Sequence, residues 1–244
     1  MRDDEILSVL RECADSIGES IEAHRGRGYS GLRDTQYHLD LAADEAGLRV
    51  LLGAGFRVVS EESGVSGEGE LTVVIDPIDG STNCDRGIPF YATSLAVLHQ
   101  GNLVAGMVVN QATKTYFEAV RGCGATRDGE LIRTSGQTKL SNAVISFSGL
   151  PDRHLGWSQV RSMGAASLEC CLVADGSLDA YAVAQKSMLH PWDYLAGLLI
   201  AEESGAAAAE YRGESLVIET AIGRRPIFAS SVELLSEILS YGVL

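Results

Sequence analysis

The sequence lacks paired cysteines, long apolar runs and a segment like a signal peptide, and each absence excludes a class of protein. It has five cysteines, an odd number without a CxxC pair, so we expect reduced thiols and neither a zinc site nor a disulfide framework. No stretch reaches the roughly 20 apolar residues that a membrane-spanning helix needs. The first residues are acidic and unlike a signal peptide. We therefore predict a cytoplasmic protein that does not enter a membrane.

Basic residues are also scarce. The chain has 19 Lys and Arg against 33 Asp and Glu, a net charge of -14, which disfavours nucleic acid and anionic membranes as partners. The same charge repels a phosphate ester, unless bound divalent cations neutralise it locally. The 244 residues are 45% apolar and 21% charged, a composition typical of folded proteins with a sizeable core.

The segment LTVVIDPIDGSTNC, residues 71–84, is the centre of the chain's organisation. Its apolar, β-branched start predicts a buried strand that ends at Asp76, before Pro77 and a polar turn that begins a helix. Asp76 and Asp79 can converge there beside backbone N–H groups that lack an intrahelical partner. Carboxylates attract a hard cation, and free N–H groups attract phosphate. The alternative is a turn in which Asp79 caps the helix and Asp76 is solvated.

The residues before this segment predict two amphipathic helices and a strand. Apolar spacing favours helices over residues 3–23 and 39–53, joined by a glycine-rich loop. A strand over residues 56–60 delivers Glu61 and Glu62, which are otherwise typical of a solvated edge. Because neighbouring strand residues face opposite sides, we expect only one of the two to point at the Asp76 turn. The linker GVSGEGE that follows is predicted to be flexible.

The residues after the segment 71–84 predict both strands and helices. Strand-like runs separated by turn residues at 100–102 and 111–113 favour a meander of three antiparallel strands over residues 89–119. Further on we predict a helix of small residues and a second helix near Asp193, for which helix N-cap is one possible role. Strands are predicted over the ranges 143–147, 178–184, 215–220 and 226–230, with a final helix over 232–239.

Four stretches resemble a known family in the same order along the chain. DPIDGSTN at residues 76–83 resembles the DPIDGTxN signature of the inositol monophosphatase superfamily, which comprises magnesium-dependent, lithium-sensitive phosphatases. SEESG at 60–64, RSMGAASLECCLVADGSLDAY at 161–181 and HPWDYLAGLLIAEESGA at 190–206 resemble its other conserved patterns. The resemblance spans about residues 30–210.

The resemblance implies an α+β fold, the layered α-β-α-β-α sugar-phosphatase-like fold. Residues 1–130 would form an N-terminal α+β subdomain that carries the metal site. Residues 131–244 would form a C-terminal α/β subdomain that completes the active site. Only about thirty residues separate Leu131 from Arg161, which is too few for the family's long helix, so we expect a shortened second subdomain.

The resemblance also implies the residues of a metal site. Two or three Mg²⁺ ions would be held by the backbone carbonyl of Ile78 and by four carboxylates, those of Glu61, Asp76, Asp79 and Asp193. The predicted catalytic residues are Glu61, Ser81 and Asp79, of which Glu61 and the Ser81 hydroxyl would orient the attacking water. Backbone N–H groups of Gly80 and Ser81 would bind phosphate oxygens. Inhibition by Li⁺ is expected.

The rest of the substrate would meet a different part of the chain. Gly164, Ala165 and Ala166 stand at a helix start, where N–H groups can contact substrate, although close helix packing is the alternative. Lys186 occupies the region of the family's inositol-contacting glutamate and favours a second anionic group on the substrate. The partner is thus a small-molecule phosphate ester, and the family suggests a homodimer.

One family motif is altered. Where relatives have VTxAD this chain has QYHLD, so only Asp40 matches, and Arg33 stands near the position of the family's upstream lysine. Asp40 would support a third metal or, more simply, act as a helix N-terminal carboxylate.

The predicted function is a Mg²⁺-dependent phosphomonoesterase that hydrolyses a small polyol phosphate, with inositol monophosphate as the first candidate. Histidinol phosphate, fructose 1,6-bisphosphate and phosphoadenosine phosphate are the alternatives within the superfamily. A catalytically weak regulatory protein that binds metal and phosphate is the alternative of another class.

Overall fold

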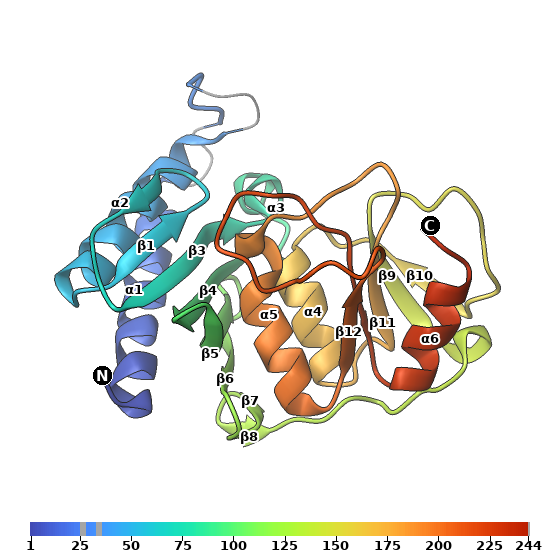
Figure 1. The fold of residues 1–244 in the computed structure, drawn as a ribbon. Coiled ribbons are helices and arrows are strands. Elements are labelled where there is room, and N and C mark those ends of the chain that lie inside the picture. The colour runs from blue at the N-terminus through green and yellow to red at the C-terminus, as the bar shows by residue number, and fades with distance from the viewer. Residues whose placement is uncertain (25–27, 33–35, 244) are drawn as a thin grey trace.

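The computed structural model describes residues 1–24, 28–32 and 36–243, which form five layers (Figure 1). Helices α1 (Asp3–His24) and α2 (His38–Gly53) pack together on one face of a large sheet. Helices α4 (Ala166–Ala174) and α5 (Pro191–Ser204) lie between this sheet and a smaller one. Helix α6 (Val232–Ser240) covers the other face of the smaller sheet. This α-β-α-β-α order confirms the predicted fold.

The large sheet has eight strands in the order β2-β1-β3-β4-β5-β6-β7-β8. Strand β3 pairs parallel with β1 and antiparallel with β4, and β4 to β6 form the predicted meander. Residues 64–66 of the linker expected to be flexible instead form β2, which pairs antiparallel with β1. The bounds are β1 (Arg57–Ser60), β2 (Gly64–Ser66), β3 (Leu71–Asp79), β4 (Ala92–His99), β5 (Asn102–Asn110), β6 (Thr115–Val120), β7 (Ala125–Arg127) and β8 (Glu130–Leu131).

Strand β3 continues past the point where the sequence predicts its end. Its pairing with β4 includes Asp76 opposite Ser94 and Asp79 opposite Ala92, with a register shift between the two pairs. The irregularity falls at Pro77, which has no N–H to give to a ladder, so the strand can bulge there and resume pairing. The expectation that β3 ends at Asp76 was therefore wrong, and both aspartates lie on one strand.

The smaller sheet has five strands in the order β10-β9-β11-β13-β12. Between β8 and α4 the chain, which is described throughout this stretch, has the 3₁₀ turn η1 (Leu140–Asn142) and two strands but no α-helix. The predicted absence of a long helix is confirmed here. The bounds are β9 (Val144–Ser148), β10 (Gln159–Arg161), β11 (Ala180–Val183), β12 (Ala207–Glu210) and β13 (Pro226–Ala229).

The prediction of a strand at residues 215–220 was wrong. The strand that pairs with β13 is β12, whose sequence AAAE is poor in the β-branched and aromatic residues that favour strands. Alanine suits this position because β12 packs against both α5 and α6. Residues 215–220 include the buried Leu216, whose carbonyl accepts a hydrogen bond from the Tyr194 hydroxyl at 2.8 Å.

Three apolar clusters follow the layers. The first joins α1 and α2 to the large sheet, the second surrounds α4 and α5 between the sheets, and the third joins α6 to the smaller sheet. Among the described residues, no helix is long and apolar enough to cross a membrane. The layers leave the end of β3, the short helix α3 (Ser81–Arg86) and the N-terminus of α5 facing one another.

Candidate active site

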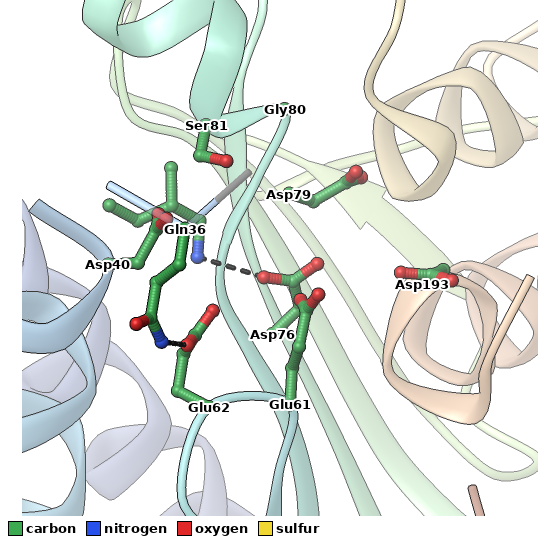
Figure 2. Close-up of a pocket in the computed structure, with 10 residues that line it drawn as sticks. Gln36, Asp40, Glu61, Glu62, Asp76, Asp79, Gly80, Ser81 and Asp193 are labelled. Carbon is green, nitrogen blue, oxygen red and sulfur yellow. Dashed lines mark hydrogen bonds between the residues drawn. The ribbon is translucent and has the colours of Figure 1, made fainter. Parts of the chain in front are cut away.

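A cavity of about 210 Å³ lies where β1, β3, α2, α3 and α5 meet. Side chains from these elements converge on it (Figure 2). No Lys or Arg is among the described residues that line it. Its lining is Gln36, Asp40, Glu61, Glu62, Asp76, Ile78, Asp79, Gly80, Ser81 and Asp193.

The turn after β3 is held by its own hydrogen bonds. The Ile78 N–H donates to Asp76 Oδ1 at 2.9 Å, and the Thr93 hydroxyl donates to the Pro77 carbonyl at 2.9 Å. Gly80 has φ of 86°, and a Cβ added there would lie 2.9 Å from the Gly164 carbonyl oxygen. Only glycine fits both the left-handed conformation and the close approach, so the turn itself requires the glycine of DPIDG.

Three carboxyl groups approach one another in the cavity. Glu61, Asp76 and Asp193 each offer an oxygen within 4.8 Å of the others. Burial, followed by the charge of Glu62, raises the pKa of Glu61 to about 7. Burial and the charge of Glu61 raise the pKa of both Asp76 and Asp193. Hard oxygen ligands, crowded together with no basic side chain among the described lining residues, fit a divalent cation.

Asp193 and Asp40 occupy equivalent places on two helices. Asp193 is in the first turn of α5 and accepts the His190 N–H at 2.6 Å, while Asp40 in the first turn of α2 accepts the Tyr37 N–H at 2.8 Å. The proposed N-cap role of Asp193 is corrected, because His190 is the cap and Asp193 stands three residues later. Asp40 is a helix N-terminal carboxylate as expected, and it also lines the cavity. Both carboxylates face the positive end of a helix dipole.

Asp79 turns towards α4. Its Oδ2 accepts the Ser167 N–H at 2.7 Å and the Ser167 hydroxyl at 2.5 Å, while Oδ1 accepts the Ala166 N–H at 3.2 Å. Burial raises the pKa of Asp79 to about 6, and the bonds from Ser167 and Ala166 oppose that rise. The alternative that Asp79 caps α3 is wrong, since Gly80 precedes α3 and the carboxylate binds the start of α4 instead. Oδ1 accepts only the Ala166 bond, so this carboxylate, which also lines the cavity, retains acceptor capacity.

Glu62 was expected to point away, and the structure places it in the cavity. Glu61 and Glu62 follow β1 in a turn, so strand alternation does not separate them. The Gln36 side-chain amide donates to Glu62, and the Ser30 hydroxyl donates to Gln36 Oε1 at 2.9 Å. Arg33, placed by sequence near the family's lysine, lies outside the described residues.

The expected substrate contacts divide into two groups. Gly164, Ala165 and Ala166 line a second cavity of about 200 Å³, which shares Asp79 and Asp193 with the first. The Ala166 N–H is engaged by Asp79, so it is not free for a substrate as the sequence suggested. Lys186 lines neither cavity, because its side chain is 87% exposed and lies 3.9 Å from Asp152.

Two positioning residues were not found from the sequence. Ser167 holds Asp79 as described, and the Asn83 side-chain amide donates to the carbonyls of Phe90 and Met163, both at 2.8 Å. These bonds tie the β3 turn to the loop before α4. Asn83 belongs to the DPIDGSTN motif and Ser167 to the stretch at residues 161–181 that also resembles the family, but neither stretch shows that Ser167 bonds Asp79, which is 88 residues away.

The chain is similar to known proteins of one family. The model of the inositol monophosphatase family matches residues 5–240. A fructose-1,6-bisphosphatase/inositol-1-monophosphatase of Archaeoglobus fulgidus is 40% identical over 182 residues, covering 72% of this chain and 71% of its own. The Nus factor SuhB of Pseudomonas aeruginosa is 31% identical and covers 88% of each chain.

Solved structures give the same result. The crystal structure of an inositol monophosphatase–fructose 1,6-bisphosphatase is 31% identical, with a TM-score of 0.85 over 98% of this chain and 99% of its own. The family model covers nearly all of the chain, and the relatives match it over both sheets. The chain therefore belongs to the inositol monophosphatase family, a family of phosphoric monoester hydrolases.

Proposed function

We propose that the protein hydrolyses the monophosphate ester of a small polyol with the help of Mg²⁺, with inositol monophosphate as the first candidate. The convergence of Glu61, Asp76 and Asp193 within 4.8 Å carries the proposal. Three buried or half-buried carboxyl groups with raised pKa values are costly in a folded protein unless a cation neutralises them.

The residues fit Mg²⁺ as the cation. The donors would be the carboxylates of Glu61, Asp76, Asp79 and Asp193 with the backbone carbonyl of Ile78, all of which line the cavity. When bound, Mg²⁺ supplies a Lewis acid that polarises phosphate oxygens and lowers the pKa of a bound water. Inhibition by Li⁺, a homodimeric state and a cytoplasmic location remain predictions beside this proposal.

The side chains then have separate tasks. Glu61 and the Ser81 hydroxyl orient the attacking water, and the N–H groups of Gly80 and Ser81 bind phosphate oxygens. Asp79 is fixed by α4 and Asp193 by the His190 N–H, so both keep their places without substrate. Loss of either aspartate should nearly abolish turnover.

The test is phosphate release from inositol 1-phosphate, histidinol phosphate, fructose 1,6-bisphosphate and phosphoadenosine phosphate, with and without Mg²⁺. We expect Mg²⁺-dependent release in the wild type and almost none in Asp193→Asn. Release that does not need Mg²⁺, or that survives in this variant, would refute the metal-site assignment. Fructose 1,6-bisphosphate is the strongest rival substrate, because relatives of this chain carry both activities in their names.

A second candidate function is regulatory. It is favoured by the relative named as a Nus factor, which matches most of this chain. Measurable Mg²⁺ binding without phosphate release from any ester would support it over the enzymatic proposal.

A further inference from the structure

A chain of hydrogen-bonded polar side chains lies in the apolar layer between α1 and the large sheet. Thr93 on β4 is fully buried, and Gln111, which follows β5, is 3% exposed. Tyr91 and Leu95, two residues to either side of Thr93, belong to the apolar cluster of this layer. Neither Thr93 nor Gln111 lines the two cavities. Buried polar groups destabilise a protein unless they are hydrogen-bonded, so their partners indicate their role.

The two ends of this chain fix the direction of each hydrogen bond within it. The Lys114 ammonium, which can only donate, donates to Gln111 Oε1 at 2.8 Å. Gln111 Nε2 donates to the Ala14 carbonyl of α1 at 2.8 Å and to Thr93 Oγ1 at 2.9 Å. A hydroxyl has one hydrogen, and Thr93 gives it to the Pro77 carbonyl at 2.9 Å. The Thr93 hydroxyl is therefore committed to Pro77.

Close packing against α1 holds the Gln111 amide in place. A Cβ added to Gly18 of α1 would lie 2.6 Å from Gln111 Oε1, so the helix backbone comes close to the amide. Both hydrogens of Nε2 are already engaged, one by α1 and one by Thr93. The amide thus has no room to swing away and no spare donor, and it orients the Thr93 hydroxyl.

The hydrogen bond from Thr93 ends on a peptide group that also contacts a proposed metal ligand. The Pro77 carbonyl and the Ile78 N–H belong to one planar peptide unit and point in opposite directions. The carbonyl accepts from Thr93, and the N–H donates to Asp76 Oδ1 at 2.9 Å. The pairing of β3 with β4 is irregular between Asp76 and Asp79, so the regular ladder does not fix this unit. Rotation of the unit would break both hydrogen bonds together.

We propose that Thr93 and Gln111 are positioning residues for the metal site, because they hold the Pro77–Ile78 peptide in the orientation that places the Asp76 carboxylate and the Ile78 carbonyl for Mg²⁺. The inference rests on the proposed function, in which Asp76 and Ile78 supply metal ligands. Mg²⁺ requires nearly octahedral ligand positions, whereas Ca²⁺ accepts variable ones. A rotated peptide would therefore weaken Mg²⁺ binding more than Ca²⁺ binding, since the carboxylate charges stay in place.

The test measures Mg²⁺ and Ca²⁺ binding to the full-length protein by isothermal titration calorimetry without substrate. Thr93→Val keeps the shape of the side chain and removes its hydroxyl. We expect this variant to bind Mg²⁺ roughly 10- to 100-fold more weakly, as the loss of a buried hydrogen bond does, and Ca²⁺ within about threefold of wild type. Thr93→Ser keeps the hydroxyl and should bind Mg²⁺ within about threefold of wild type.

A second variant tests the link before Thr93. Gln111→Met replaces the amide by an unbranched side chain of similar size, so the Thr93 hydroxyl loses the bond that directs it. We expect Mg²⁺ binding to weaken by about three- to tenfold, and the double variant to bind no more weakly than Thr93→Val, because both residues act through one peptide.

Thr72→Val is the matched control. Thr72 is also a buried threonine of the large sheet, and its hydroxyl accepts the Arg57 guanidinium at 3.2 Å. It lines neither cavity, so this variant should bind Mg²⁺ with wild-type affinity.

The outcomes separate this inference from the proposed function. Wild-type Mg²⁺ affinity in Thr93→Val, or additive losses in the double variant, would overturn the inference. Equal losses for Mg²⁺ and Ca²⁺, or a loss in Thr72→Val as well, would also overturn it and give Thr93 a general role in the stability of the sheet. A wild type that binds Mg²⁺ and releases no phosphate would refute the proposed function alone, because the calorimetry uses no substrate. A wild type that binds no Mg²⁺ would overturn both.

Discussion

Replacing Asp193 by asparagine should make the metal-free protein more stable while removing its response to Mg²⁺. Its carboxylate lies within 4.8 Å of those of Glu61 and Asp76. Two unit charges at that distance repel by about 3 kcal/mol at an effective dielectric constant near 20. Partial protonation reduces this sum, so we expect a gain of about 1–3 kcal/mol at pH 8, or about 2–4 °C in Tm for each kcal/mol. Asparagine keeps the acceptor for the His190 N–H.

The assay is thermal unfolding at pH 8 in EDTA and again in 10 mM Mg²⁺. Asp40→Asn is the matched control, because Asp40 holds the same helix position and makes the same kind of bond to the Tyr37 N–H. It lies outside the group of three converging carboxyl groups. We expect Mg²⁺ to raise the Tm of wild type and of Asp40→Asn, and to leave that of Asp193→Asn unchanged.

Two results would refute this reasoning. A lower Tm for Asp193→Asn in EDTA would mean that the carboxylate of Asp193 stabilises the start of α5 by more than its repulsion from Glu61 and Asp76 destabilises the protein. Equal stabilisation of all three proteins by Mg²⁺ would mean that the cation binds somewhere other than this cluster.

Three further perturbations test the surrounding structure. Burial raises the pKa of Glu169 from 4.5 to about 7, so this group by itself should lower wild-type stability by roughly 3 kcal/mol as pH rises through that window. When urea unfolding is compared at pH 4.5 and pH 8, Glu169→Gln should lack this part of the fall, whereas the part due to Glu61 and Asp79, whose pKa values burial also raises, should remain. Ser167→Ala removes the hydroxyl that donates to Asp79 at 2.5 Å and should cost about 1.5–3 kcal/mol in the same measurement, unless a water replaces it. Gly80→Ala should lower both Tm and phosphate release, because alanine disfavours a φ of 86° and its Cβ would lie only 2.9 Å from the Gly164 carbonyl oxygen. A variant with the Tm and phosphate release of the wild type would show that the turn can shift to accept a Cβ.

The sequence was sufficient for the fold, and it named four acidic residues that the structure brings together at one cavity. Periodicity located α1, α2 and α6, since each packs one side against the protein. The meander was located by its apolar runs and the turn residues between them, and its strands are buried on both faces. Three of the four motifs contain Glu61, Asp76, Asp79 and Asp193, which line the first cavity, whereas Asp40 lies in the altered QYHLD and Glu62 was expected to point away. The short connection after Leu131 correctly excluded a long helix, because the number of residues in a connection limits the length of any helix within it, however the connection packs.

What sequence reasoning missed depends on contacts between distant segments. The partner of Asp79 is Ser167 on α4, and neither residue carries a local sign of the other. Glu62 was assigned to the wrong side because strand alternation was extended into a turn. Lys186 was assigned to the substrate because it occupies the region of the family's inositol-contacting glutamate, but its side chain, in the loop after β11, is exposed to solvent.

The way the acidic residues are held explains how so negative a protein can keep them together. Asp40 and Asp193 each accept an N–H at the start of a helix, and Asp79 accepts two N–H groups at the start of α4. Three helix N-termini thus place positive dipole ends beside the cavity, which offsets part of the repulsion between the carboxylates. The remaining charge is not neutralised by any described lining side chain, so it stays available to a cation. A lysine introduced at the cavity wall would stabilise the fold by the same electrostatics and would compete with the metal for its ligands.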